Sequence, residues 1–500
     1  MKTIALATAV VSMLLFVACG GSNTGSNPLV AQYKVSAPEG SSVTVQFGTD
    51  TNYGLATSPV TVPAGQDSVT VLVAGMRPNT KYHMRAITTM PDSSQQTDSD
   101  HTYTTGGIPP DLIPSVRVTT HSGMQASSGV ELLGLNPAGG SADKRLTVLA
   151  LDPSGNIIWY YNYDHSLGIA QPVKLLPNGH FLLNLYVGTA APGGLLREID
   201  LAGNTIHEFS VDDLNQWLST AGYNFTAYSM HHDFVLLPNG HLLVLMNINK
   251  DFDNLVGYSG TTTVLGDAIV DLDPDYNPVW VWSTFDHLDV NRHPMQFPDW
   301  THANALVYSP DDGNLLLSLR HQYWVLKIDY ANGQGTGDIL WRLGPGGDFT
   351  LLNSSSPADW FYAQHYANIV SPNSAGDFQL ALFDNGDNRV LDTSGTVCGV
   401  NGAPACYSRP AIFEVNENDK TAQVLWSQQT VYSFWGGAIQ ELPNSNLFVD
   451  ITTPADNIKG ARMVELTQEQ TPQVVWQLDV NGQNSYRTIH LPSLYPGVQW

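Results

Sequence analysis

The chain has 500 residues, with 21 Lys or Arg against 45 Asp or Glu, and only 13% of its residues are charged. A formal net charge of −24 argues against nucleic-acid binding, because proteins that bind nucleic acid carry basic surfaces. The length allows two or more domains with cores of their own, and 44 glycines and 30 prolines fit a turn-rich β protein better than a helical one.

The N-terminus has the pattern of an export signal. A basic residue precedes the apolar run Ile4–Val17, which is too short to span a bilayer, and a Gly/Ser/Asn tract follows. The ending Phe16–Cys19 resembles a bacterial lipobox, so we expect cleavage before Cys19 and acylation of that cysteine; cleavage without acylation is the alternative. We predict a signal peptide over 1–18, a linker over 19–27, and a periplasmic protein that lipid anchors to the outer membrane.

Residues 28–106 are expected to form a small β domain. The segments VAQYKVSA, SSVTVQFG, DSVTVLVAG and KYHMRAITT alternate between apolar and polar residues, as short strands do. The stretch GMRPNTKYHMRA resembles the loop-to-strand corner of fibronectin type III domains, where a tyrosine after a proline turn anchors the next strand. No cluster of catalytic residue types occurs here, and a Gly/Pro linker at Gly106–Pro110 ends the domain.

A repeated unit occupies the domain that we predict over 107–500. Each copy has an apolar-acidic strand, a turn and a strand that usually carries Trp, followed by a hairpin on a Pro/Asn/Gly turn. Six copies without helical periodicity predict an all-β fold, a six-bladed β-propeller, with VELLGLNP closing the last blade. We interpret the tryptophans as packing between blades. The first halves of the copies are LALDPSGNIIWYY, EIDLAGNTIHEF, IVDLDPDYNPVWVW, KIDYANGQGTGDILW, FEVNENDKTAQVLW and VELTQEQTPQVVW.

One hairpin, Asp299–Gln322, carries the strongest functional signal. Apolar runs flank the turn Pro310–Gly313, and folding about that turn returns Arg320 to the end of the sheet that holds His302. An imidazole beside a guanidinium is suited to an oxyanion, because Arg offers a rigid fork of donors.

Histidines recur at the same place in three predicted hairpins. His231, His302 and His365 each lie seven or eight residues before the proline of the turn. We therefore expect three imidazoles and Arg320 to face one cavity at the propeller rim. Strand alternation sends either His231 or His232 into that cavity, and the repeat register favours His231.

The segments MHHDFVLLPNGH, DWTHANALVY, SLRHQYWVLKID and AQHYANIV resemble signature segments of the bacterial aryl-sulfate sulfotransferases, over roughly Val130–Pro496. That resemblance implies an exported six-bladed propeller with an accessory N-terminal β domain, and a histidine that carries the sulfuryl group as sulfohistidine. It makes His365 the nucleophile and gives sulfate binding and proton transfer to His302, Arg320 and His231. A phenolic sulfate donor and a phenolic acceptor are the implied partners. No nucleotide or other cofactor is expected, and a homodimer is considered.

Apart from Cys19 the chain has two cysteines, Cys398 and Cys406, in CGVNGAPAC. An even pair that closes a short Gly/Pro loop in an exported protein predicts a disulfide. This pair follows His365, whereas we expect it before the nucleophile in enteric members of the resembled family.

Two other readings of the site are open. Three imidazoles suit a transition metal, as in a metal-dependent propeller enzyme such as a polysaccharide lyase, although Arg320 would repel the cation. The propeller could also serve as a non-catalytic binding platform, which the charged residues in one ring argue against.

Overall fold

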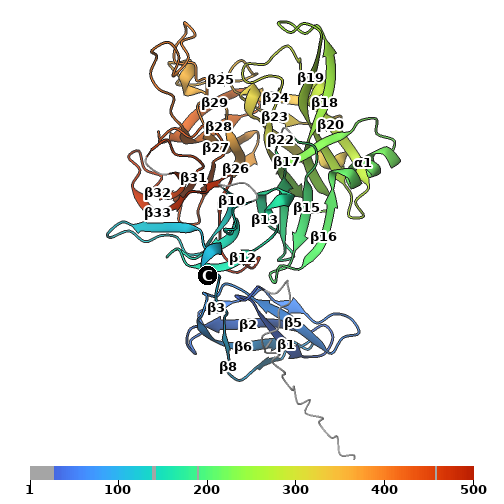
Figure 1. Ribbon diagram of the computed structural model, residues 1–500, viewed down its shortest axis with the longest axis vertical. Coiled ribbons are helices and arrows are strands. Elements are labelled where there is room, and N and C mark those ends of the chain that lie inside the picture. The colour runs from blue at the N-terminus through green and yellow to red at the C-terminus, as the bar shows by residue number, and fades with distance from the viewer. Residues whose placement is uncertain (1–26, 138–141, 189–190, 457–458) are drawn as a thin grey trace, which may run out of the picture.

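In the computed structural model the described residues are 27–137, 142–188, 191–456 and 459–500, and they form an all-β protein of many small sheets (Figure 1). The predicted signal peptide and the acylation at Cys19 lie outside this part of the chain. Within it, no helix is long and apolar enough to cross a membrane. The helices are α1 (Val211–Thr220) and α2 (Thr284–His287), and the short 3-10 segments are η1 (Pro110–Leu112), η3 (His165–Leu167), η4 (Arg320–Gln322), η5 (Ala331–Gly333) and η6 (Pro357–Asp359).

The N-terminal unit consists of two small sheets around a core of Tyr33, Phe47 and Tyr82. The Tyr82 hydroxyl accepts a hydrogen bond from Arg77 N–H at 2.9 Å, across the proline turn that suggested such a corner. One sheet pairs β1 (Ala31–Ser36) with β5 (Ser68–Val73). The other contains β2 (Ser42–Gly48), β3 (Leu55–Ala56), β4 (Val60–Thr61), β6 (Lys81–Thr89), β7 (Gln95–Thr97) and β8 (His101–Thr104).

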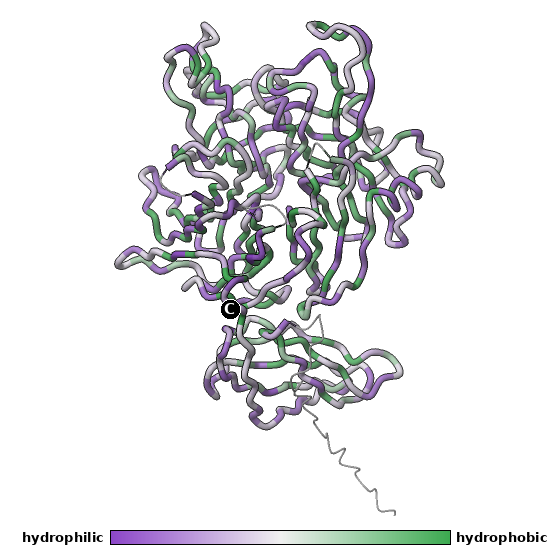
Figure 2. The backbone as a smooth tube through the Cα atoms, viewed as in Figure 1, coloured by the Kyte–Doolittle hydropathy of each residue, from purple (hydrophilic) through white to green (hydrophobic). Residues whose placement is uncertain are grey.

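The rest of the described chain folds into six mainly antiparallel sheets in a propeller-like arrangement, each named here by one strand. Figure 2 shows apolar and polar segments alternating along the chain. Three sheets come first in the chain. The β10 sheet contains β10 (Val130–Asn136), β11 (Val148–Leu151), β12 (Ile157–Tyr161), β34 (Asn484–Ser485) and β35 (Ile489–Leu491); the β13 sheet contains β13 (Ile169–Leu175), β14 (Phe181–Tyr186), β15 (Leu195–Ile199) and β16 (Thr205–Ser210); the β17 sheet contains β17 (Ala227–Leu236), β18 (Leu242–Asp253), β19 (Thr261–Leu272) and β20 (Pro278–Ser283).

In the other three sheets a hairpin is followed by two outer strands, and β25 or β9 adds a fifth strand to two of them. The β21 sheet contains β21 (Ala303–Ser309), β22 (Asn314–Leu319), β23 (Trp324–Ile328) and β24 (Ile339–Leu343); the β26 sheet contains β26 (His365–Ser374), β27 (Asp377–Asp384), β28 (Arg409–Asn416), β29 (Thr421–Ser427) and β25 (Thr350–Leu351); the β30 sheet contains β30 (Ala438–Glu441), β31 (Leu447–Ile451), β32 (Gly460–Leu466), β33 (Val474–Asn481) and β9 (Ser115–Thr120).

Repeated tryptophans pack neighbouring sheets against each other, as we predicted, although the β13 sheet has no Trp at this position. Trp159 Nε1 donates to Leu201 O at 2.7 Å, and Trp282 Nε1 donates to Gly337 O at 2.8 Å. Trp476, in the β30 sheet, donates to Pro153 O in the β10 sheet at 2.7 Å. A buried indole N–H needs a partner, and here each one finds it in the neighbouring sheet.

The beginning and the end of this region share one sheet, because β10 pairs with β11 on one side and with β34 and β35 on the other. VELLGLNP therefore joins both ends of the repeat region. The C-terminal tail then crosses to the N-terminal unit: the Tyr495 hydroxyl donates to Leu72 O at 2.8 Å, and Trp500 packs edge-on against Phe47. This tail ties the two units together at the end of the molecule away from the β18–β19 tip (Figure 1).

Candidate active site

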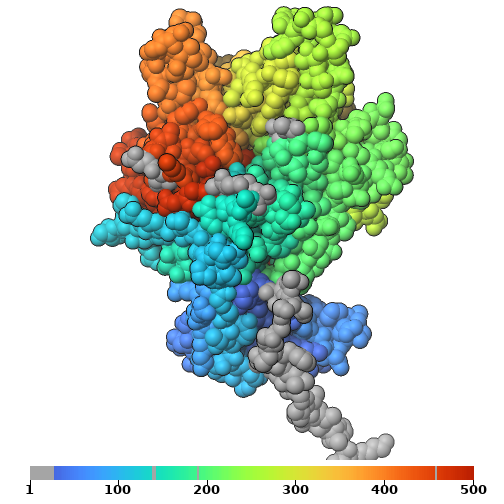
Figure 3. All heavy atoms as spheres, in the orientation of Figure 1, coloured from blue at the N-terminus to red at the C-terminus, as the bar shows by residue number. Residues whose placement is uncertain are grey.

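The predicted site residues lie at one rim of the sheets. The hairpin of β18 and β19 extends beyond the start of β17, at the rim that holds His232. The segment 385–408 extends beyond the start of β26, at the rim that holds His365. Figure 3 shows these projections, yellow-green and orange, with a hollow between them. Residues 385–408 also contain the predicted disulfide, Cys398–Cys406, which is formed.

The strands that carry the site have an unusual backbone. His232, His302 and Tyr366 have φ angles of 54°, 50° and 50°, in the left-handed region, and the pairing register shifts beside each of them. For non-glycine residues this conformation costs about 1–2 kcal/mol each, and such residues often lie at functional sites. A bulge of this kind re-aims side chains, which strict strand alternation does not foresee.

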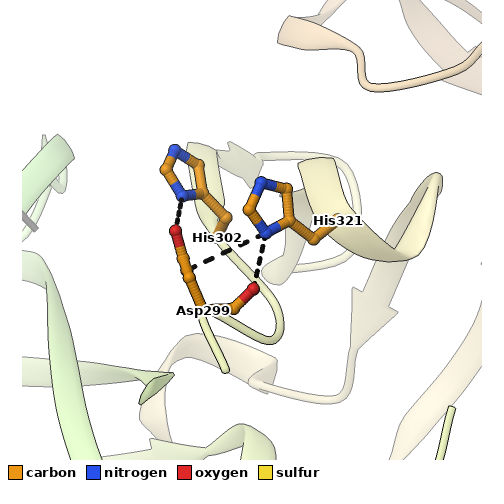
Figure 4. A group of neighbouring side chains, drawn as sticks. All are labelled: Asp299, His302 and His321. Atoms are coloured by element: carbon orange, nitrogen blue, oxygen red, sulfur yellow. Dashed lines mark hydrogen bonds and ion pairs between the residues drawn. The ribbon is translucent and has the colours of Figure 1, made fainter. Parts of the chain in front are cut away.

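His302 is oriented by Asp299 (Figure 4). Its Nδ1 lies 2.7 Å from Asp299 Oδ2, and its ring stacks on that of His321 with centroids 4.5 Å apart. Burial raises the pKa of Asp299, but the charge and hydrogen bond of His302 outweigh it, so the pKa lies well below its usual range. Asp299 is therefore a carboxylate that accepts the Nδ1–H of His302, which leaves Nε2 directed away from it.

Arg320 meets His302 as the hairpin prediction requires, since Ala303 pairs with Leu319 and Arg320 N–H donates to His302 O at 3.2 Å. Its guanidinium donates to His321 Nε2, Asp387 Oδ2 and Phe434 O, each at 2.8 Å. The side chain is thus fixed, and its Nε–H, which is buried, has no hydrogen-bond partner among the described residues.

The structure corrects the choice between the adjacent histidines. His232, and not His231, lies against His302, with ring centroids 4.9 Å apart, because the bulge at His232 breaks the alternation on which we relied. His231 turns into the sheet, where Nε2 lies 3.1 Å from Asp267 Oδ1 and Nδ1 lies 2.7 Å from His232 Nδ1. His231 therefore lies between His232 and the buried Asp267, although its Nε2 makes no hydrogen bond among the described residues. Burial, followed by neighbouring positive groups, lowers the pKa of His232.

Asp267 connects the two histidine-bearing strands. Its Oδ2 accepts hydrogen bonds from the Thr301 hydroxyl at 2.5 Å and from Ala303 N–H at 2.8 Å, on either side of His302. One buried carboxylate thus supports the backbone around His302 and lies next to His231.

His365 lies at the start of β26, buried, with a single tautomer imposed by its neighbours. Asn385 Nδ2 donates to Ser433 O and Gly436 O, so its Oδ1 faces His365 Nδ1 at 2.7 Å and accepts from it. His365 Nε2 then holds the lone pair, and Gly436 N–H donates to it at 3.3 Å. Burial, and after it the charge of Arg320, lowers the pKa of His365 well below the usual value. His365 is a neutral imidazole.

The floor of the site comes from the C-terminal segment before β35. The Tyr486 ring packs edge-on against His232 and His365, with centroids 5.3 and 6.1 Å away. Arg487 donates to Asn304 O at 2.8 Å and lies over the Tyr366 ring, 4.4 Å from its centroid. Its buried charge is balanced by Asp233, 3.3 Å away.

A family model for arylsulfotransferases matches residues 122–487, which include every strand of the site. The chain belongs to the arylsulfotransferase family. It is 27% identical to an arylsulfate sulfotransferase AssT of Escherichia coli and 26% identical to one of Lelliottia amnigena, in each case over 27% of this chain and 24% of the relative. The match thus spans about a quarter of each relative's length.

Solved structures share less sequence identity with this arylsulfotransferase-family chain than these two relatives do. Synechocystis apocarotenoid oxygenase aligns with a TM-score of 0.31 and 12% identity, over 90% of this chain and 82% of that one. An ACO/RPE65 chimera aligns with a TM-score of 0.28 and 14% identity, over 91% and 94% of the two chains.

Asp299, His302 and His321 are also close enough to be considered as metal ligands, with one ligand atom from each residue within 4.8 Å of the others. These groups already bond to one another, however: His302 Nδ1 to the Asp299 side chain, and His321 Nδ1 to Asp299 O at 2.6 Å. The guanidinium of Arg320, bonded to His321 Nε2, would repel a cation. The donor set fits an anion better than a metal ion.

Sequence reasoning missed five groups of this site: Asp299, His321, Asn385, Gly436 N–H and Tyr486. The first two lie inside the hairpin segment that we singled out, at three residues before His302 and one after Arg320, and this proximity was an available signal. Asn385 and Gly436 reach His365 from distant segments, and Tyr486 comes from a stretch outside the repeat. For these three the sequence shows no pattern that could have found them.

Proposed function

We propose that this protein is an aryl-sulfate sulfotransferase that moves a sulfuryl group from a phenolic sulfate to a phenolic acceptor through sulfohistidine at His365. The observation that carries the proposal is the neutral His365 with its Nε2 lone pair fixed by Asn385. A neutral imidazole is a competent nucleophile, and a covalent intermediate divides one difficult displacement into two easier ones. Family membership supports the same substrate class.

In the first half of the reaction His365 Nε2 attacks sulfur, the new N–S bond forms, and the S–O bond to the phenol breaks. Arg320 Nε, which has no partner among the described residues, is available for one sulfuryl oxygen. Gly436 N–H, displaced from Nε2 by the incoming sulfur, is available for another. Fixed donors of this kind stabilise developing charge without reorganising during the reaction. His302 supplies the proton to the departing oxygen.

In the second half an acceptor phenol gives its proton to His302 and attacks sulfur, and the N–S electron pair returns to His365 Nε2. The sequence is ping-pong, because the first phenol leaves before the second one reacts. Asn385 is a neutral acceptor and leaves Nδ1 protonated throughout. The sulfated ring is therefore cationic, which makes it a good leaving group.

The proposal includes an architecture. We infer a closed six-bladed propeller from the six sheets, from the bond between Trp476 and Pro153 and from the sharing of one sheet by β10, β34 and β35. The N-terminal unit is interpreted as fibronectin type III-like on the contact of Tyr82 with Arg77. Export to the periplasm with a lipid anchor at Cys19 is part of the proposal and rests on the sequence pattern.

Burst kinetics test the function. Mixing the protein with a chromogenic aryl sulfate and no acceptor should release up to one phenolate per site rapidly, and an added phenol should then restore turnover. His365→Ala should abolish the burst, because no nucleophile remains. His287→Ala, at a partly buried histidine outside the site, is the control and should keep it. An undiminished burst in His365→Ala would contradict the assignment.

A further inference from the structure

We infer that Asp299 is a positioning residue that holds His302 as the proton donor to the leaving phenol. The inference rests on the proposed function and concerns one atom of the site, His302 Nε2, which would donate the proton. Its basis is the direct contact between the carboxylate and the imidazole at the rim of the site, 2.7 Å long (Figure 4).

The geometry leaves His302 a single free nitrogen. Nδ1–H donates to Asp299 Oδ2, so Nε2 is the atom through which the ring can exchange a proton with a substrate. In the described residues no hydrogen bond occupies Nε2, and the ring faces the neutral His232 on its other side. A carboxylate bound to Nδ1 also stabilises the imidazolium form. Asp299 therefore fixes the direction in which the acid presents Nε2.

Asp299 contacts His321 through a different atom. The backbone carbonyl of Asp299 accepts the Nδ1–H of His321 at 2.6 Å, so His321 Nε2 accepts from Arg320. Burial lowers the pKa of His321 to about 3, and a neutral ring keeps this acceptor over the working pH range. The Asp299 carboxylate also lies near His321, with Oδ1 3.9 Å from His321 Nδ1. An Asn at this position keeps the backbone contact with His321 and a side-chain acceptor for His302, and removes only the charge.

The proton balance follows from this arrangement. When the S–O bond breaks, the phenol oxygen keeps the electron pair and takes the proton from His302 Nε2. His302 becomes neutral and keeps its Nδ1–H on Asp299. The acceptor phenol returns a proton to Nε2 in the second half, so no external acid or base is consumed. The need for this proton depends on the leaving group, because a weakly basic nitrophenolate departs unprotonated.

The test is Asp299→Asn, which retains an acceptor for Nδ1–H but removes the charge. We would measure the rate constant of the burst with aryl sulfates from phenyl to dinitrophenyl sulfate. The variant should be slowed ~10²-fold with phenyl sulfate, the lower range for loss of general acid catalysis. With dinitrophenyl sulfate it should stay within ~3-fold of the parent, because that leaving group needs no proton.

The matched control is Asp289→Asn. Asp289 lies in the same loop between α2 and β21, and among the described residues its side chain bonds only to Asn291, within its own turn. This variant should leave the whole series unchanged. An equal slowing with every aryl sulfate, or no slowing at all, would overturn the inference. Absence of a burst in the parent protein with all of the sulfates would instead contradict the proposed function, so the two failures are distinguishable.

Discussion

Two site histidines are oriented by different partners, and this difference matches their proposed roles. His302 rests against the carboxylate of Asp299, whereas His365 rests against the neutral amide of Asn385. A nucleophile must be neutral, and a proton donor must be charged. The partner of each ring therefore matches its proposed role: the carboxylate of Asp299 stands beside the proton donor, and the amide of Asn385 stands beside the nucleophile.

Asn385→Ala should impair sulfation because His365 loses the acceptor that fixes its tautomer. The ring could then carry its proton on Nε2, where it blocks attack. By analogy with the loss of tautomer control in a serine-protease triad, we expect the burst rate to fall ~10²–10⁴-fold. Asn388→Ala, three residues on in the same segment, should stay near the parent rate. A burst in Asn385→Ala within a few-fold of the parent would refute this account of the tautomer.

At the scale of elements, the segment 484–488 connects the floor of the site to the closing strands. Asp450, buried in β31, accepts from the Ser485 hydroxyl and from Thr488 N–H, each at 2.8 Å, so it holds both sides of Tyr486 and Arg487. Burial raises the pKa of Asp450 to about 7, despite these two hydrogen bonds. One carboxyl group thus couples the anchoring of the floor to pH.

The sign of this coupling can be worked out. With its folded pKa above the unfolded value of about 4, Asp450 binds more protons in the folded state between these values, so stability falls as pH rises from about 4 to 7. The loss is at most ~4 kcal/mol, from three pKa units. Asp450→Asn imitates the protonated form and should flatten this part of the curve of unfolding free energy against pH. Asp419→Asn, at an exposed carboxylate, should keep the parent slope; an unaltered slope in Asp450→Asn would disprove the coupling.

Features of the fold that depend on residues close together in the chain, such as hairpin pairing, could be predicted from the sequence. The turn fixed the pairing that brings Arg320 to His302, and the repeated Trp indicated packing between sheets. The choice of His231 failed because a left-handed residue at 232 interrupts the alternation, and strand periodicity carries no signal for that. Asn385 and Tyr486 reach the site through loops of irregular length, so only three-dimensional packing reveals them.

At the scale of the whole molecule, the site is assembled from segments spread over more than half of the chain, from His232 to Tyr486. The ends of the repeat region share the β10 sheet, and the C-terminal tail packs into the N-terminal unit through Trp500. Removal of residues 28–105 would expose this tail. We therefore expect the repeat region alone to behave differently from the intact protein.

The most direct test of the central claim is the mass of the intact protein after mixing with an aryl sulfate in the absence of acceptor. The account predicts a gain of one sulfuryl group, lost in acid as expected for an N–S bond. Fragmentation should place it on the peptide that contains His365, and addition of a phenol should remove it. Turnover without any adduct, or an adduct on a residue other than His365, would contradict the account.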